Sequence, residues 1–300
     1  MTPDWLTRLG KLRVDTDSIK GRAPHKPLLL LAVIDLVETG LIKDGAVDLS
    51  PDLLLRFQNL WPIVLERRRN RGDIQLPFHA LASDKVWTVF DSEHRPSRSR
   101  ETSVRAQLDP SLAAVLMDPS FRSDARSKLI TGYFPVTEQV ALAAALGISE
   151  AALRCRQSEL VAGDIAEARK RGRSARFKNI VVSGYRFTCA LTGYRLIMLT
   201  NSGIVEAAHI HAFRDSRNDD PSNGLALTPT AHALFDRGLW SVDNELRVIV
   251  RSKTEFSEEV PLGGFSLRAL AGQPLHIPNG VTLRPSLENL AWHRRFHRFT

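Results

Sequence analysis

One segment, residues 205–238, constrains the fold most, because its pattern predicts four small elements in a fixed order. Its first residues are apolar and β-prone, and the polar stretch that follows ends in Asn-Gly, a dipeptide that favours a tight reversal. A short apolar run and a stretch that Thr228 or Thr230 can cap, ending at Gly238, then predict a strand and a helix. The elements expected are a strand, a polar loop, a strand and a helix, over residues 205–210, 214–224, 225–227 and 228–238.

The bulk composition bounds the class of protein. A chain of 300 residues with 43% hydrophobic and 25% charged side chains has room for about two globular domains. Its net charge of +8 favours a polyanionic partner, most often nucleic acid, although ordinary surfaces also carry such charge. Cys155 and Cys189 are its two cysteines, which excludes an intrachain four-cysteine zinc site and fits a reducing compartment. No signal-like or membrane-spanning apolar run is found, so we expect a cytoplasmic protein without a membrane partner.

The first half of the chain has the pattern of a mainly helical domain. Pro24 starts a helix that continues through an apolar run to Gly40, and Pro51 starts another. Residues 74–81 and the VWTVF stretch after them predict a small β-hairpin, with Pro77 at an edge or a bulge. A long charged helix is expected over residues 149–178. The predicted class is α+β, with a mostly helical domain at residues 1–146, a basic helical linker at 147–178 and a second domain at 179–300.

Three polar residues stand out in residues 205–238: His209, Asn223 and His232, with GLAL after the Asn and FDRG after the second His. On these residues the segment resembles the HNH, or ββα-metal, nuclease family, in which a strand carries the first His, the loop supplies the Asn and the helix supplies the second His. The resemblance implies a ββα-metal nuclease domain that hydrolyses phosphodiester bonds. That reaction requires a base to activate water and a Lewis acid to stabilise charge on the phosphate. The alternative is three polar residues of an ordinary turn-rich fold.

The resemblance implies a role for each catalytic residue. His209 would be the general base, because a near-neutral imidazole accepts a proton at physiological pH. Asn223 would orient the His209 side of the site through amide hydrogen bonds. His232 would be a metal ligand at the start of the helix. His211 shares a strand face with His209 and would be a phosphate contact or a structural residue.

One position departs from the family pattern. Many HNH nucleases have a metal-binding Asp or His directly before the base, and here that residue is Ala208. Glu206 shares the strand face of Ala208 by the period-two rule, and Asp236 lies one helical turn after His232. Both carboxylates are therefore candidate metal ligands beside His232. Carboxylate, imidazole and water ligands predict one divalent ion, Mg²⁺ or Mn²⁺, and no structural zinc.

Two motifs of the first half, APHKPLLLL and LPFHAL, resemble the amino-terminal domain of bacterial HNH restriction endonucleases whose sulfur-binding domains recognise phosphorothioate-modified DNA. The resemblance implies backbone contacts from His25 and Lys26 and an apolar cup for the sulfur at Pro77 and Ala80. Sulfur is larger and more weakly hydrated than oxygen, so apolar contact favours it. Leu76 stands where the family pattern has a Tyr. The alternative is that these residues only start a helix and fill the core at a strand edge.

Together, these features predict a modification-dependent restriction endonuclease that cuts double-stranded DNA in bacterial defence. The alternatives are an HNH nuclease that reads unmodified or base-methylated DNA, and a catalytically dead DNA-binding module that lost a ligand at Ala208. Cutting both strands requires two active sites or two events, and a homodimer would supply two sites. The residues expected to contact DNA are Arg22, His25, Lys26, Arg67, Arg68, Arg69, Arg71, Leu76, Pro77 and Ala80.

Overall fold

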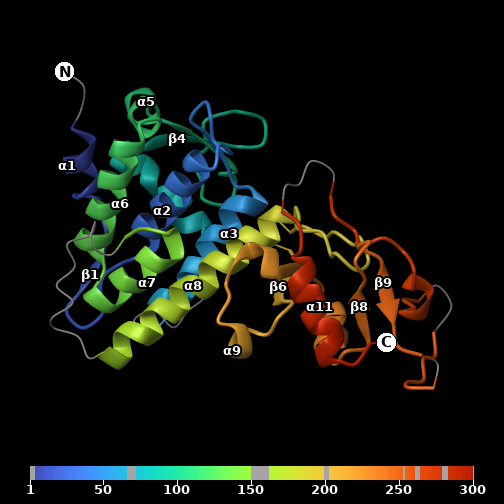
Figure 1. Ribbon diagram of the computed structural model, residues 1–300. Coiled ribbons are helices and arrows are strands. Elements are labelled where there is room, and N and C mark those ends of the chain that lie inside the picture. Colours follow the sequence, from blue (N-terminus) through green and yellow to red (C-terminus); the bar gives the residue numbers. More distant parts are fainter. Residues whose placement is uncertain are drawn as a thin grey trace. The chain divides into compact units, whose positions relative to one another are not determined.

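The structure is a computed structural model that describes residues 4–65, 72–149, 162–198, 203–252, 254–260, 264–278 and 283–299. Two compact units make up the chain, the first ending at Arg176 and the second beginning at Phe177. Helices and small antiparallel sheets occur in both units (Figure 1), so the predicted α+β class is confirmed. The linker expected at residues 147–178 stays a prediction.

The first unit is built around α2 (His25–Glu38), in which nearly every side chain from Pro27 to Val37 is buried. Burying a Leu, Val or Ile side chain stabilises a fold by about 1.5–3 kcal/mol, so the apolar run of α2 supplies much of the driving force for this unit. The other helical segments are α1 (Trp5–Leu9), α3 (Pro51–Leu60), η1 (Trp61–Val64), α4 (Gln75–Ala80), η2 (Leu81–Asp84), α5 (Pro110–Leu116), α6 (Pro119–Tyr133) and α7 (Val136–Leu146). Of these, α3, α4 and α6 pack directly on α2.

Two small sheets complete the first unit. A hairpin of β1 (Thr16–Asp17) and β2 (Gly21–Arg22) lies before α2 in the chain. The larger sheet has the antiparallel order β3 (Ala46–Asp48), β5 (Arg105–Leu108), β4 (Trp87–Phe90). The central residues of the three strands pair in register. Their side chains point to one face of the sheet and are buried there.

The prediction that residues 74–81 belong to a hairpin, with Pro77 at a strand edge, is wrong. These residues form α4 and the start of η2, and Pro77 is the third residue of α4 and is buried. Ile74, Phe78 and Leu81 are buried at helical spacing, and that packing outweighs the short alternating pattern. Proline fits the first helical turn, since its missing N–H would have no intrahelical partner there.

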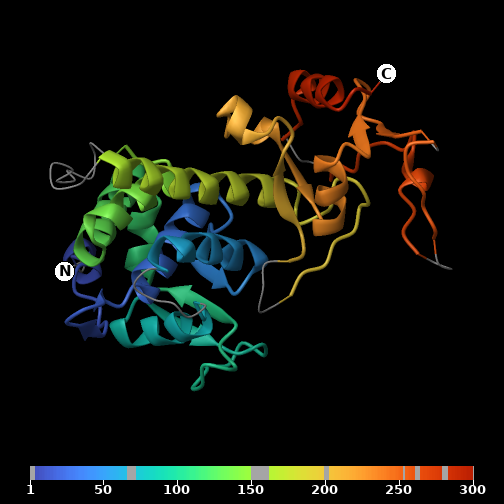
Figure 2. The ribbon, with the colours of Figure 1, turned by 90° about the horizontal axis from the view of Figure 1, so that it is seen from below.

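The long charged helix is α8 (Ala162–Gly184), shown in yellow-green in Figure 2. It extends past the predicted end at residue 178, and the predicted part from 150 to 161 lies outside the described residues. Gly172 gives α8 its close approach to α7, because a Cβ there would lie 2.1 Å from the Ala141 carbonyl oxygen and 2.6 Å from the Ala144 Cβ. Gly172 is therefore needed for packing within the first unit.

The second unit contains the elements expected over residues 205–238, in the predicted order. Strand β6 (Glu206–His209) pairs antiparallel with β7 (Gly224–Leu227), and α10 (Pro229–Asp236) follows. The loop also contains two short helical turns, α9 (Phe213–Ser216) and η5 (Pro221–Asn223). The later elements are β8 (Trp240–Val242), β9 (Val248–Val250), η6 (Arg268–Leu270) and α11 (Leu287–Phe296). Its core, with Tyr185 and Trp240 among its largest members, is separate from that of the first unit.

Candidate nuclease site and DNA-reading pocket

The ββα unit holds the three residues of the HNH pattern at fixed places. His209 ends β6, and its backbone lies opposite Gly224 in β7. Asn223 directly precedes β7, and His232 is the fourth residue of α10, which Pro229 begins. Strand pairing therefore brings together residues that are far apart in sequence, and the first helical turn presents the second histidine beside them.

Asn223 is fully buried and fixes the backbone that follows the first histidine. Its side-chain carbonyl accepts a hydrogen bond from the His211 backbone N–H at 2.8 Å. Its amide group donates to the carbonyls of His211 and Asn218, at 3.0 Å each. All three hydrogen bonds go to main-chain atoms and none goes to the His209 ring. Asn223 thus holds the loop in place after β6, and it affects the ring of His209 only through the backbone.

The imidazole of His209 is held by a ring and a carboxylate. It stacks on Phe177 with ring centroids 3.9 Å apart and an interplanar angle of 3°. Its Nε2 lies 3.1 Å from Asp219 Oδ1. Burial lowers the pKa of His209 by more than the Asp219 carboxylate raises it, so the ring is neutral at physiological pH. A neutral imidazole with one nitrogen paired to a carboxylate has its other nitrogen available as a proton acceptor.

Asp219 is a candidate functional residue that the sequence reasoning missed. The loop contains adjacent aspartates, and Asp220 uses its carboxylate to cap η5 through Ser222. Nothing in the sequence distinguishes the capping aspartate from the one that pairs with a histidine ten residues earlier. A search for acidic residues able to fold back on the first histidine would have named both.

His232 lies between two carboxylates. Its Nδ1 is 2.7 Å from Glu206 Oε1, and its Nε2 is 3.5 Å from Asp236 Oδ2. The side chains of Glu206 and Asp236 are 51% and 62% exposed, so both carboxylates remain within reach of solvent. The structure therefore brings the three expected metal-site residues together, with Glu206 at one ring nitrogen of His232 and Asp236 at the other.

A hollow of about 400 Å³ in the second unit adjoins this arrangement. Its lining includes His209 and Asp236 together with three aromatic residues, Phe213, Trp292 and Phe296. Neither Glu206 nor His232 is among the residues that line it, so Asp236 is the member of this group that reaches the hollow. Among the described residues, no three His, Cys, Asp or Glu side chains are grouped so that together they could hold a metal ion.

In the first unit, a second hollow of about 220 Å³ brings together residues from two distant motifs. We call it the reading pocket. Five of its lining residues were expected to contact DNA, and four were not: His25, Lys26, Leu76, Pro77 and Ala80, with Arg13, Val14, Asp15 and Ala23. Arg22 does not line it, because its guanidinium donates to the Gly132 carbonyl and lies over the Tyr133 ring. Arg67, Arg68, Arg69 and Arg71 lie outside the described residues.

The basic residues of the reading pocket differ in how much of their charge is available. Lys26 is nearly buried, and its ammonium donates to Asp84 at 2.5 Å and to the Arg13 carbonyl at 2.8 Å. Its charge is therefore paired within the protein, and the expected contact to the DNA backbone stays a prediction. The exposed Arg13 side chain makes no ion pair with any residue that the structure describes. Arg13 is therefore better placed than Lys26 to contact a ligand in this pocket. It lies before the APHKPLLLL motif in the sequence.

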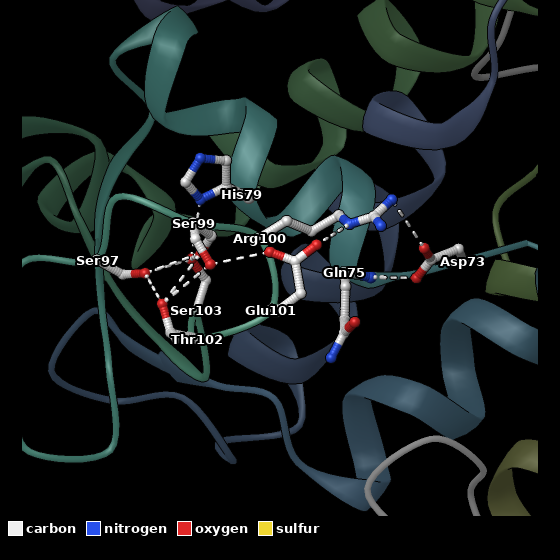
Figure 3. A network of polar contacts seen from close by, with 9 residues as sticks. All are labelled: Asp73, Gln75, His79, Ser97, Ser99, Arg100, Glu101, Thr102 and Ser103. Carbon is white, nitrogen blue, oxygen red and sulfur yellow. Dashed lines mark hydrogen bonds and ion pairs between the residues drawn. The ribbon is translucent and has the colours of Figure 1, made fainter.

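Helix α4, which carries Leu76, Pro77 and Ala80, is tied to a neighbouring loop by the polar network in Figure 3. His79 Nδ1 lies 2.9 Å from the hydroxyl of the buried Ser103, which in turn donates to the Ser99 carbonyl at 2.8 Å. Before the helix, Asp73 accepts from the Gln75 backbone N–H at 2.9 Å. These contacts fix the end of α4 and hence the wall of the reading pocket.

A strand, a loop and a helix that present His, Asn and His in this geometry define a nuclease domain of the ββα class. Residues 189–243 match the family described as HNH endonuclease, so the second unit contains an HNH endonuclease domain. Among solved structures, the chain is similar to one titled modification dependent TagI restriction endonuclease, at 20% identity and a TM-score of 0.32. That match covers 41% of this chain and 37% of the other chain. No curated protein matches the chain. None of the described helices is long and apolar enough to span a membrane.

Proposed function

We propose that the chain is a modification-dependent restriction endonuclease that hydrolyses phosphodiester bonds of duplex DNA. The observation that carries the proposal is the pairing of a neutral His209 with Asp219 close to a second histidine held by two carboxylates. His209 has the environment of a proton acceptor, and His232 has the environment of a cation ligand. The basic composition of the chain, with a net charge of +8, favours a polyanionic substrate.

His209 acts as the general base in this proposal. Asp219 accepts a hydrogen bond from Nε2–H, which fixes the tautomer and leaves the lone pair of Nδ1 to take a proton from water. Stacking on Phe177 keeps the ring plane in place, and Asn223 holds the backbone beyond it. In this proposal Asp219 sets the tautomer of His209, while Phe177 and Asn223 hold its ring and its backbone in place.

At His232, an exposed carboxylate and an imidazole nitrogen supply two protein donors of the kinds that divalent cations accept, and a second carboxylate lies at the other ring nitrogen. The two nitrogens of the ring point in opposite directions, so Glu206 and Asp236 are not equivalent. We assign Asp236 and Nε2 of His232 as ligands, because Asp236 lines the hollow with His209. Glu206 would then accept from Nδ1–H and orient the ring. When bound, Mg²⁺ or Mn²⁺ supplies Lewis-acid stabilisation of the charge on the phosphate.

The reading pocket supports the finer proposal that the first unit senses a modified DNA backbone. Its lining includes the apolar side chains of Pro77 and Ala80 and that of the half-exposed Leu76. His25 and Arg13 supply polar and cationic groups at the same pocket. Apolar contact beside a phosphate-binding cation favours a sulfur-substituted phosphate over an ordinary one.

Cleavage of plasmid DNA with Mg²⁺ or Mn²⁺ tests the nuclease. Wild-type protein should cut, and His209→Ala should lose at least about a hundredfold in rate, the usual contribution of a general base. Equal absence of cutting by both proteins on every DNA tried would favour the DNA-binding module that Ala208 suggests. A homodimer, which would supply two sites, should appear as a dimer mass in light scattering of the cutting species.

Paired substitutions test the two carboxylates. Asp236→Asn should weaken Mn²⁺ binding, measured by calorimetry, by more than Glu206→Gln does, because removing a ligand costs more than removing the group that orients it. The effect of Glu206→Gln should fall within about ten- to a hundredfold. A larger loss for Glu206→Gln than for Asp236→Asn would reverse the assignment.

The reader is tested by binding of full-length protein in EDTA to phosphorothioated, methylated and plain duplexes. The proposal predicts tightest binding to the phosphorothioate, and Ala80→Asp should remove that preference by placing a charge in the apolar pocket. Equal affinity for the three duplexes would favour the alternative, an HNH nuclease that reads unmodified DNA. Tightest binding to methylated DNA would favour a reader of base modification.

A further inference from the structure

Three rings form a short column beside the candidate base. His211 stacks on Trp292 with centroids 3.7 Å apart and an interplanar angle of 17°. Trp292 stacks on Phe296 with centroids 4.8 Å apart and an angle of 15°. Phe296, the last ring of the column, is 52% exposed. The column therefore ends in a partly exposed ring, whose further neighbour is His297 in an edge-to-face contact with centroids 4.9 Å apart.

The two segments that carry the rings of the column, the backbone at His211 and helix α11, are each held by contacts within the second unit. Asn223 hydrogen-bonds the His211 backbone at both its N–H and its carbonyl. The helix that carries Trp292 and Phe296, α11, is anchored by the buried His293, which lies 2.9 Å from the Ser241 hydroxyl and stacks on Phe235. The rings thus have a fixed orientation, which lowers the entropy lost when a further ring stacks on them.

The position and charge of the column point to one kind of occupant. Trp292 and Phe296 line the same hollow as His209 and Asp236. Arg214 also lines the hollow, and Arg295, which precedes Phe296 in the sequence, is exposed and makes no side-chain hydrogen bond or ion pair with the residues that the structure describes. Aromatic faces interleaved with cations are how proteins bind nucleic acid whose bases are not covered by neighbouring bases.

We propose that Phe296 stacks an unpaired DNA base beside the scissile phosphate, with Trp292 and His211 supporting its ring from behind. The inference rests on the proposed nuclease function and adds a second contact, to a base, in the same hollow. In an intact duplex both faces of an interior base are covered, so this contact requires a frayed, flipped or strand-terminal base. The column therefore selects locally opened DNA at the cleavage site.

The experiment compares two single strands of equal charge and a length of about twelve nucleotides, one of thymidine and one of abasic sugar-phosphate. Full-length protein binds them in EDTA, so no hydrolysis occurs. Stacking of one base corresponds to a difference in affinity of about tenfold to a hundredfold. Wild-type protein should bind the thymidine strand more tightly than the abasic strand by such a factor. Phe296→Ala should bind the abasic strand with wild-type affinity and lose the tenfold to hundredfold gain on the thymidine strand.

The variants separate stacking from other effects. Phe296→Tyr, which keeps the ring, should retain the preference, whereas Phe296→Leu, which keeps apolar volume without a ring face, should lose it. Phe265→Ala removes another exposed aromatic residue of the same unit, 45% exposed and not part of the hollow, and should behave as wild type. An unchanged preference in Phe296→Ala, or equal weakening on both strands, would overturn the inference. Plasmid cleavage by the wild type decides the nuclease proposal separately, since it does not depend on the preference for bases.

Discussion

Acid should unfold the second unit through one buried histidine, His293. Only 2% of this residue is exposed, and its ring lies between Phe235 and the hydroxyl of Ser241. Burial, together with the nearby His297 and Arg294, lowers the pKa of His293 to about 3. The folded unit therefore disfavours the protonated ring, whereas the unfolded chain accepts the proton near the ordinary pKa of 6.5.

The size of the effect follows from the two pKa values. Because the folded pKa is below the unfolded one, the contribution of neutral His293 is fully present above pH 6.5 and is lost as the pH falls toward about 3. At about pH 4.5 the unfolded state has gained roughly two pKa units of protonation free energy, or about 3 kcal/mol. A domain is typically stable by about 5–15 kcal/mol, so this loss alone removes a large part of the stability.

Urea unfolding at about pH 7.5 and pH 4.5, followed by hydrogen exchange of peptides from β8 and α11, measures the second unit alone. His293→Gln, which is neutral at both pH values, should lose about 3 kcal/mol less between them than the wild type does. His276→Gln, an exposed position in the same unit, should show the wild-type difference. The reasoning fails if wild type and His293→Gln have the same pH dependence of unfolding free energy.

Three further outcomes follow from contacts described above. Asp219→Asn should lower the cleavage rate by about a hundredfold or more and move the acidic limb of the pH–rate profile to lower pH, because it removes the carboxylate that raises the pKa of the base. Gly172→Ala should destabilise the first unit by about 1–3 kcal/mol in thermal unfolding through overpacking, whereas Gly163→Ala, which meets no atom within 4 Å, should be neutral or slightly stabilising. Lys26→Met should cost about 3–5 kcal/mol in urea unfolding by leaving Asp84 buried without its partner, and adding Asp84→Leu should recover most of that loss.

The elements that the sequence predicts well are those with both a periodic pattern and a terminal signal. In the ββα segment, the apolar run before His209 and the Asn-Gly before Leu225 define two strands whose pairing the structure has in register. In α2, Pro24 and the continuous apolar run define a helix buried on nearly all sides. Such signals act locally, so the chain's own sequence is sufficient to reveal them.

The errors come from contacts between distant residues. The LPFHAL motif alternates as a strand would, but Phe78 and Leu81 pack on a helical face, and only the tertiary core decides between the two patterns. The pairing of Lys26 with Asp84 likewise depends on the fold and has no signal in the motif, while the DNA contact that the resemblance implies for Lys26 stays a prediction. The Asp219 contact to His209 depends on how the polar loop folds back, which no local pattern encodes.

The structure also bears on the alanine that precedes the candidate base. Ala208 is fully buried, so its side chain points into the core, and a ligand at that position would require a different strand environment. The negative charge that a cation needs is found instead at Glu206 and Asp236, both half exposed or more and both beside His232. Acidic side chains beside His232 therefore come from Glu206, on the same strand as Ala208, and from Asp236, on α10. With Asp236 beside His232, the site keeps an acidic side chain although residue 208 is an alanine.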